Sequence, residues 1–377
     1  MVPDEMITAM LDKYTASNSH VKFEYEVVPF ADYFNKLGLA LGSGLAADTF
    51  MVNEVWAYAD AKQFAPAPEV FAKDVRENFG AAGKPPDYKG NVYGYPLEGG
   101  LRMVIYNKDH FAEAGIADPA NDGCEDWAQL LEWSKALTKK QGNETLQEGW
   151  KINQPGYWIA VAEWFWMAGG EFCTDECKEF KLDQKAWLDA VQWWADCALV
   201  HKVADMKFAA DTFDKGQSAM TVYSLSTVGQ MRKFSQINYG AFMNPPQVKG
   251  GQRWHDDGPW MYGVNAAAKP EAQEESWKFL QWLTNDENGV EMAKEYISIF
   301  RTSAIQAAMP HLDPVLTRFF EADSHVHPRT PKYWRIWVTR VQGALTKVYL
   351  GEMSVKDSAV LVEGQINDDI KTASGSL

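Results

Sequence analysis

The sequence lacks the short motifs that mark many nucleotide-binding and hydrolytic sites. It contains no GxGxxG or GxxxxGK[ST] phosphate-binding loop, no GxSxG nucleophile turn and no HExxH zinc motif. The pair Cys173-x3-Cys177 is a poor zinc half-site, because the usual CxxC spacing is missing and no histidine pair follows at a useful distance. The common signatures of dehydrogenases, NTPases, serine hydrolases and zinc proteases are therefore absent.

Long apolar runs and an excess of basic residues are also missing. No stretch of 18 apolar residues occurs, and the longest candidate, residues 158–170, contains Glu163 and so indicates a buried helix. The chain has 36 basic and 51 acidic residues, a net charge of −15. This balance argues against binding to nucleic acid or to anionic lipid. The start MVPDEM has no basic or apolar leader, which fits a cytoplasmic protein or a mature chain whose signal was removed.

Cysteine is scarce, with four residues in the chain. Cys173 and Cys177 lie in the polar turn EFCTDECKEF rather than in an apolar stripe. This setting predicts a local disulfide, which requires an oxidising compartment, and the alternative is four reduced thiols.

Tryptophan, in contrast, is abundant. The chain of 377 residues is long enough for two or three domains and contains 16 Trp, 15 Tyr and 19 Phe. Indole is a costly core residue, so this excess in an acidic chain suggests a surface that stacks on a flat ligand.

Hydrophobic periodicity predicts alternating strands and helices. Helices are expected at 4–16, 32–41, 182–202 and from Pro270 onward, and a capping box at Ser354 begins the last one. Strands are expected at 21–30, 47–53, 91–100, 101–107, 220–224 and 238–246. This alternation is typical of an α/β protein with largely parallel sheets.

Three sets of polar residues could serve metal binding or acid–base catalysis. They are His325 and His327 beside Asp323, the run His255–Asp256–Asp257, and the acids Glu54, Glu98 and Glu163 near aromatic residues. Paired acids would suit glycoside hydrolysis. Solvated loops explain the histidine sets more simply, so no metal or cofactor is expected.

Five segments, taken in order, resemble those of extracellular solute-binding proteins of ABC sugar importers, the maltose- and trehalose-binding type in particular. They are YFNKL with a Gly-Ser-Gly turn and ADTF (33–50), GYPL to IYNKD (94–109), FDKGQSAM (213–220), AAAKP to WKFL (266–280) and LGEMS to IN (350–367). Each segment is weak alone, and their order and spacing carry the resemblance.

The resemblance implies an α/β fold of the periplasmic-binding-protein-like type II, with two lobes, a hinge and an interlobe ligand cleft. The expected N-terminal lobe comprises residues 1–107 and 263–308, and the C-terminal lobe 108–262 and 309–377. The family begins with a central strand, whereas this chain begins with a helix. Because losing a central strand leaves unpaired edges, we expect a native segment before Met1 that carries the strand and a signal or lipid anchor.

The implied function is capture of a mono- or oligosaccharide in the cleft and its delivery to the permease subunits of an ABC transporter. Such a receptor is no enzyme and is expected to be a monomer, periplasmic or extracytoplasmic, without nucleic-acid partners. Two alternatives remain: a glycoside hydrolase that uses Glu54 and Glu98, or the same fold with a polyamine, organic anion or phosphate ester as ligand.

Sugars present C–H faces to aromatic rings and hydroxyl groups to planar polar side chains. The resemblance and these chemistries together give the expected ligand contacts. They are Asn53, Glu54, Trp56, Glu98, Gly99, Gly100, Arg102, Tyr157, Trp158, Tyr223, Ser224, Ser226, Trp260, Tyr262, Arg301 and Trp334. Trp260 and Trp334 are favoured because their Gly- and Pro-rich surroundings are poor settings for core indoles, whereas Trp164 and Trp166 are expected in the core.

Overall fold

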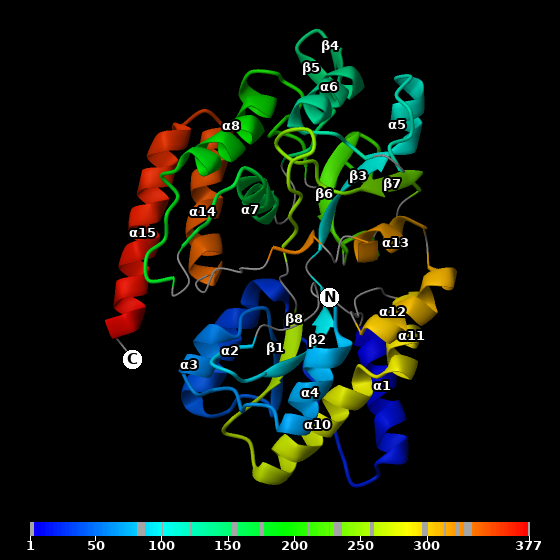
Figure 1. The fold of residues 1–377 in the computed structure, drawn as a ribbon, viewed down its shortest axis with the longest axis vertical. Helices are drawn as coiled ribbons and strands as arrows, with labels where there is room; N and C mark the ends of the chain where they lie inside the picture. Colours follow the sequence, from blue (N-terminus) through cyan, green and yellow to red (C-terminus); the bar gives the residue numbers. More distant parts are fainter. Residues whose placement is uncertain are drawn as a thin grey trace. The chain divides into compact units, whose positions relative to one another are not determined.

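The structure is a computed structural model. It describes residues 4–80, 87–99, 101–120, 123–152, 157–173, 177–209, 211–225, 227–229, 236–256, 260–295, 301–312, 314–321, 325–327 and 334–375. The chain forms two compact units (Figure 1). The first unit comprises Met1–Gly100 and Asp257–Leu312, and the second comprises Leu101–Asp256 and Asp313–Leu377.

The first unit is a three-stranded sheet with helices packed around it. Its elements are α1 (Asp4–Ser17), α2 (Phe30–Ser43), β1 (Thr49–Val52), α3 (Trp56–Asp60), α4 (Glu69–Asn78), β2 (Gly94–Glu98), β8 (Trp260–Val264), α10 (Pro270–Leu283), α11 (Asp286–Glu295), α12 (Thr302–Ala308) and the short 3₁₀ helix Met309–His311. The strand order is β1-β8-β2. Local signals set the helix ends: Gly44 closes α2 in the left-handed conformation, and Pro270 occupies the first turn of α10.

The second unit contains a three-stranded sheet, a hairpin and a layer of long helices. Its elements are β3 (Arg102–Asn107), α5 (Lys108–Glu113), α6 (Trp127–Leu137), β4 (Lys139–Gln141), β5 (Glu144–Gln147), α7 (Tyr157–Met167), α8 (Lys185–Leu199), β6 (Met220–Ser224), β7 (Tyr239–Phe242), α13 (Pro314–Glu321), α14 (Trp334–Tyr349) and α15 (Val355–Gly375). The sheet order is β6-β3-β7, and β4 pairs with β5. Helices α7, α8, α14 and α15 pack together (Figure 1).

The expectation of largely parallel sheets is wrong for the described strands, whose ladders are all antiparallel. In the first unit β1 and β2 run in one direction, as expected for strands joined through helices. A distant segment, β8, then inserts between them in the opposite direction. In the second unit β3 lies in the same way between β6 and β7. Periodicity along the chain does not report such an insertion, so the sequence could not show it.

The strand expected at 21–30 is also wrong. Residues 21–29 form no strand, and Phe30 begins α2. Phe23 packs between α1 and α10, with ring centroids 5.9 Å from Tyr14 and 4.7 Å from Phe279. The alternating pattern therefore reflects packing of an extended segment against helices.

Strand pairing places the unit boundaries a few residues away from the expected lobe boundaries. The units divide after residues 100, 256 and 312, whereas the sequence suggested 107, 262 and 308. The strand Arg102–Asn107 pairs with β6 and β7, so it belongs to the second unit, and Trp260–Val264 pairs with β1 and β2 in the first.

Most tryptophans pack in the core of the second unit. Of the 16 in the chain, eight are buried in that core and four more pack against it. Trp164 and Trp166 are among the buried ones, which confirms their expected core position. The tryptophan excess is therefore explained mainly by packing in this core, and only a few indoles remain that could contact a ligand.

A disulfide joins Cys173 to Cys177, whose Cα atoms are 4.9 Å apart, while Cys124 and Cys197 are buried thiols. The segment after Cys177 is held to α15, because the Asn367 side-chain amide accepts from the Phe180 N–H (2.7 Å) and donates to its carbonyl (3.0 Å). Among the helices in the described part of the chain, none has the length and apolar character needed to cross a bilayer.

Candidate functional site

One end of the first unit's sheet collects several of the expected ligand contacts. Val52, the last residue of β1, lies opposite Met261, and Glu98, the last residue of β2, lies opposite Trp260. The carboxyl ends of β1 and β2 therefore flank the amino end of β8. Asn53 and Glu54 after β1, Gly99 after β2 and Trp260 in β8 share this edge, which we call the first sheet end.

Aromatic residues also occur close to these strand ends. The Trp260 ring is 5.9 Å from that of Phe34 on α2, and both are partly exposed. The neighbouring Tyr33 hydroxyl donates to the Met51 carbonyl (2.7 Å) and accepts from its N–H (3.0 Å), which ties α2 to β1 and so places Phe34. Trp56, at the start of α3, is also partly exposed. The first sheet end thus combines aromatic faces with carboxylate and amide groups.

The second unit builds a polar cluster at the corresponding edge of its own sheet. Arg102 at the start of β3 lies opposite Ser224 at the end of β6, and Val104 lies opposite Phe242 at the end of β7. Asn244, two residues beyond β7, donates weakly to the Arg102 carbonyl (3.5 Å). We call this edge the second sheet end.

Two buried acidic residues, Asp256 and Glu163, form a network with Arg102 at the second sheet end. Arg102 Nη1 is 3.3 Å from the Asp256 carboxylate. The Glu163 carboxyl group, on α7, accepts from the Asp256 N–H (2.9 Å) and contacts the Asn244 Nδ2 (2.6 Å). Burial raises the pKa of Glu163 well above its usual value; the Arg102 charge opposes this and the Asp256 charge adds to it.

His255, which the sequence suggested as part of a base cluster, is fully buried beside this network. Burial lowers its pKa to about 3, so the ring is neutral. Its Nδ1 is 2.7 Å from the Arg102 carbonyl, an acceptor, and therefore carries the proton. His327 is also buried, and its ring stacks on Trp166 at 4.4 Å. Among the described residues, no group of three or more potential metal ligands occurs.

Arg301 was expected to contact the ligand, but its described contacts place it away from both sheet ends. Its side chain is buried between α4 and α10, where Nε donates to the Thr284 carbonyl (2.6 Å) and Nη2 pairs with Asp74 (2.8 Å). The guanidinium also lies 5.0 Å from the Phe79 ring centroid. These contacts hold Arg301 within the first unit's core.

Trp334 was expected in a loop, and this expectation is also wrong. It begins α14 with 4% of its surface exposed, and its ring stacks on Trp337 at 4.6 Å. The proline-rich residues before it lie outside the described residues, so the sequence pattern marked a helix start. Trp334 fills the core of the second unit.

The other expected contacts divide into three groups. Tyr262 lies in the middle of β8 against the helical core, Tyr223 is buried against Phe213, and Trp158 packs on the second unit's core. Gly100 and Ser226 lie outside the described residues, as do the side chains of Glu98 and Tyr157. The sheet ends thus bring together Asn53, Glu54, Gly99 and Trp260 in one unit, and Arg102 and Ser224 in the other.

Sequence reasoning missed Phe34 and Asn244 as members of these ends. Phe34 belongs to a helix whose apolar pattern indicates packing, and only the β8 register brings Trp260 beside it. Glu163 could be recognised in the sequence as the one charged residue in the apolar run 158–170. Its hydrogen-bond partners could not be predicted, because they come from distant segments.

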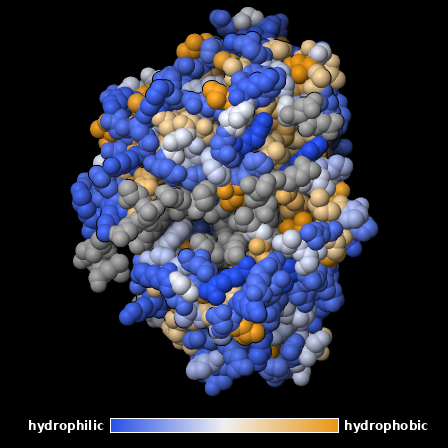
Figure 2. Space-filling view, viewed as in Figure 1, coloured by the Kyte–Doolittle hydropathy of each residue, from blue (hydrophilic) through white to orange (hydrophobic). Residues whose placement is uncertain are grey.

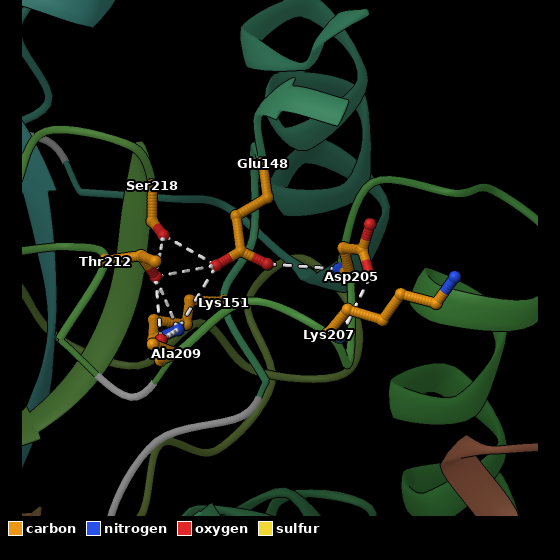
Figure 3. A network of polar contacts seen from close by, with 7 residues as sticks. All are labelled: Glu148, Lys151, Asp205, Lys207, Ala209, Thr212 and Ser218. Atoms are coloured by element: carbon orange, nitrogen blue, oxygen red, sulfur yellow. Dashed lines mark hydrogen bonds and ion pairs between the residues drawn. The ribbon is translucent and has the colours of Figure 1, made fainter. Parts of the chain in front are cut away.

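A second buried polar network lies elsewhere in the second unit (Figure 3). Lys151 donates to the Ala209 carbonyl (2.7 Å) and the Thr212 hydroxyl (2.6 Å), and lies 3.3 Å from Glu148. Glu148 also accepts from Ser218 (2.6 Å) and from the Asp205 N–H (3.1 Å). The Lys151 and Glu148 side chains are 0% and 1% exposed, so this network holds the fold together rather than meeting a ligand.

Burial raises the pKa of Glu148 and lowers that of Lys151, since each charge loses water, and their mutual attraction opposes both shifts.

On the face shown in Figure 2, hydrophobic residues appear as scattered patches in a mostly hydrophilic surface. The exposed large hydrophobic residues are likewise spread over many elements.

Comparison with known proteins identifies the family and similar solved structures. The family model described as bacterial extracellular solute-binding protein matches residues 9–317. The fold resembles an ABC substrate-binding protein from Listeria monocytogenes in complex with cycloalternan (TM-score 0.84, 20% identity, covering 98% of this chain and 97% of that one). It also resembles UgpB from Mycobacterium tuberculosis in complex with glycerophosphocholine (TM-score 0.84, 14% identity, 99% and 95%). The two-lobed type II fold is therefore shown.

Among curated proteins, the sn-glycerol-3-phosphate-binding periplasmic protein UgpB of Salmonella typhimurium is 24% identical over 297 residues. That match covers 71% of this chain and 65% of UgpB, so the chain spans about two thirds of this relative's length. Because the family model matches most of the sequence, the chain belongs to the bacterial extracellular solute-binding protein family.

Proposed function

We propose that the protein is the substrate-binding component of an ABC importer, which captures a mono- or oligosaccharide and delivers it to membrane permease subunits. The first sheet end carries this proposal, because it holds the partly exposed rings of Trp260 and Phe34, the partly exposed Asn53 and the largely buried Glu54 (5% exposed). Aromatic faces suit the C–H side of a sugar ring, and the polar groups suit its hydroxyls.

The proposal includes the hinged mechanism that the resemblance implied. The candidate contacts are Asn53, Trp56 and Trp260 in the first unit and Arg102 and Ser224 in the second. A ligand that gains contacts only in the closed form shifts the open–closed equilibrium toward it. The protein performs no chemistry, acts as a monomer, and works outside the cytoplasmic membrane, either free in the periplasm or held by a lipid anchor.

A phosphate ester is the second candidate ligand, because UgpB proteins are among the relatives. The charges favour a neutral sugar. Of the expected contacts, the two cationic residues are already paired with carboxylates, Arg102 with Asp256 and Arg301 with Asp74. A phosphate group would have to compete with these acids for the guanidinium groups.

Isothermal titration calorimetry with a sugar panel, sn-glycerol-3-phosphate and glycerophosphocholine tests the proposal. We expect binding of at least one sugar and an unchanged sugar after incubation. Trp260→Ala should weaken that binding about tenfold, which corresponds to about 1.4 kcal/mol of stacking and burial. The control is Trp282→Ala, since Trp282 packs against Tyr14 on α1 rather than at the first sheet end. Binding of phosphate esters alone, or cleavage of a sugar, would overturn the proposal.

A further inference from the structure

Glu163 joins three separate segments of the second unit at one point. Its carboxyl group projects from α7, and it accepts from the backbone N–H of Asp256 (2.9 Å) and meets the side chain of Asn244 beyond β7 (2.6 Å). Asp256 in turn holds Arg102, the first residue of β3 (3.3 Å). Glu163 is 0% exposed, whereas the Arg102 side chain keeps 14% of its surface exposed.

The charges in this cluster balance only if one acid is neutral. Among the described residues, the charged and titratable groups that face Glu163 are Arg102 from β3 and Asp256 from the segment 254–256, with neutral His255 next to them. Asp256 is the acid in direct contact with Arg102, and burial raises the pKa of Glu163, so Glu163 is the acid that favours the neutral form. The other nearby cation, Arg253, is bonded to the Asn244 carbonyl (3.0 Å).

The contact with Asn244 fits a protonated Glu163. The 2.6 Å separation is short for an amide donor and ordinary for a hydroxyl donor. The Asn244 Oδ1 has no hydrogen-bond partner among the described residues. Exchanging the two ends of the amide lets the Glu163 hydroxyl donate to Oδ1, at the expense of the weak bond from Nδ2 to the Arg102 carbonyl (3.5 Å).

We infer that Glu163 is a positioning residue of the ligand site: its neutral carboxyl group fixes Asp256, and through Asp256 the orientation in which Arg102 meets a ligand. This inference rests on the proposed function for its ligand. Glu163 itself is too deeply buried to touch a ligand, and its effect passes through the Asp256 backbone and the Asp256–Arg102 pair.

The test compares Glu163→Gln, which preserves a neutral group with one acceptor and one donor, with Glu163→Met, which removes both. With the sugar found by calorimetry, Glu163→Gln should bind within about threefold of the wild type. Glu163→Met should bind about 10- to 100-fold more weakly, because it leaves the buried Asp256 N–H without its acceptor. The control Glu148→Gln alters another buried acid of the same unit, outside the second sheet end, and should leave the affinity unchanged.

Two measurements need no ligand. The infrared band of a protonated carboxyl group should be present in the wild type and absent in Glu163→Gln. The Asp256 amide should stay protected from hydrogen exchange in Glu163→Gln. If no sugar binds, the proposed function fails, while these two measurements still decide the state of Glu163.

The inference would be overturned by wild-type affinity in Glu163→Met, by weak binding in Glu163→Gln, or by a missing infrared band. If Glu163→Met does not fold, Glu163→Gln decides alone: retained affinity, a protected Asp256 amide and a lost infrared band support the inference, and any other combination refutes it.

Discussion

Replacing Lys151 by methionine should destabilise the second unit by about 3–5 kcal/mol, because it leaves the Glu148 charge buried without its partner. The two side chains are 0% and 1% exposed, so water cannot replace the lost ammonium group. Ser218, Thr212 and the Asp205 N–H still donate to Glu148, so the carboxylate is not stripped of all its hydrogen bonds.

The loss should depend on pH. In Lys151→Met the pKa of Glu148 rises further, since the attraction that opposed burial is gone. An acid whose folded-state pKa lies above its unfolded value loses stability as pH rises from the unfolded pKa, about 4.5, to the folded one. In the wild type the folded-state pKa of Glu148 is itself above 4.5, so the penalty should grow only above that wild-type pKa, by at most about 1.4 kcal/mol per pH unit.

Urea unfolding followed by tryptophan fluorescence measures this, because most of the indoles belong to the second unit's core. The matched control is Lys207→Met: Lys207 lies close by but is exposed, and its side chain points away from Glu148 (Figure 3). We expect a change within about 0.5 kcal/mol for the control. A penalty below about 1 kcal/mol for Lys151→Met, or one that does not vary with pH, would refute the reasoning.

Four further substitutions, the last two a matched pair, test other parts of the fold. Arg301→Met should cost about 3 kcal/mol, measured by urea unfolding at pH 7. Burial alone would raise the pKa of Asp74, but the hydrogen bond from Arg301 lowers it. In the wild type the Arg301–Asp74 pair therefore contributes fully to the free energy of unfolding above about pH 3.8, and this contribution is lost on acidification. A wild-type acid profile in the variant would contradict this. Cys173→Ser should lower the unfolding free energy by about 2 kcal/mol for a loop of about five residues, and reductant should do the same to the wild type but not to the variant. Gly149→Ala should destabilise by about 1–3 kcal/mol, because its Cβ would lie 1.9 Å from the Ser134 carbonyl oxygen. Gly364→Ala, with no atom within 4 Å of its Cβ, should stabilise α15 by up to about 1 kcal/mol, and equal effects at the two glycines would refute the packing argument.

Local patterns predicted the elements whose signals lie within a few residues. The helix 4–16 and the helix from Pro270 occur as α1 and α10, and Ser354 caps α15 through its bond from the Asp357 N–H (3.0 Å). Each depends on an apolar stripe or a cap, which are properties of neighbouring residues. The segment 21–30 failed because alternation alone cannot separate a strand from an extended chain packed on helices.

The candidate site required both kinds of information. The resemblance and the chemistry of the side chains predicted Asn53, Glu54, Trp260 and Arg102 as ligand contacts, and the structure places these residues at the two sheet ends. The sequence misplaced Arg301 and Trp334, because a guanidinium or an indole suits a core pairing as well as it suits a ligand, and only the partners decide.

The sequence by itself determined the family, the two α/β units and most of the helices, since these follow from order, spacing and periodicity along the chain. Tertiary structure decided the strand directions, through the insertion of β8 and β3 between strands from other segments. It also decided the packing of most tryptophans and the burial of Glu163. Burial and pairing are properties of contacts between distant residues, and no local pattern contains them.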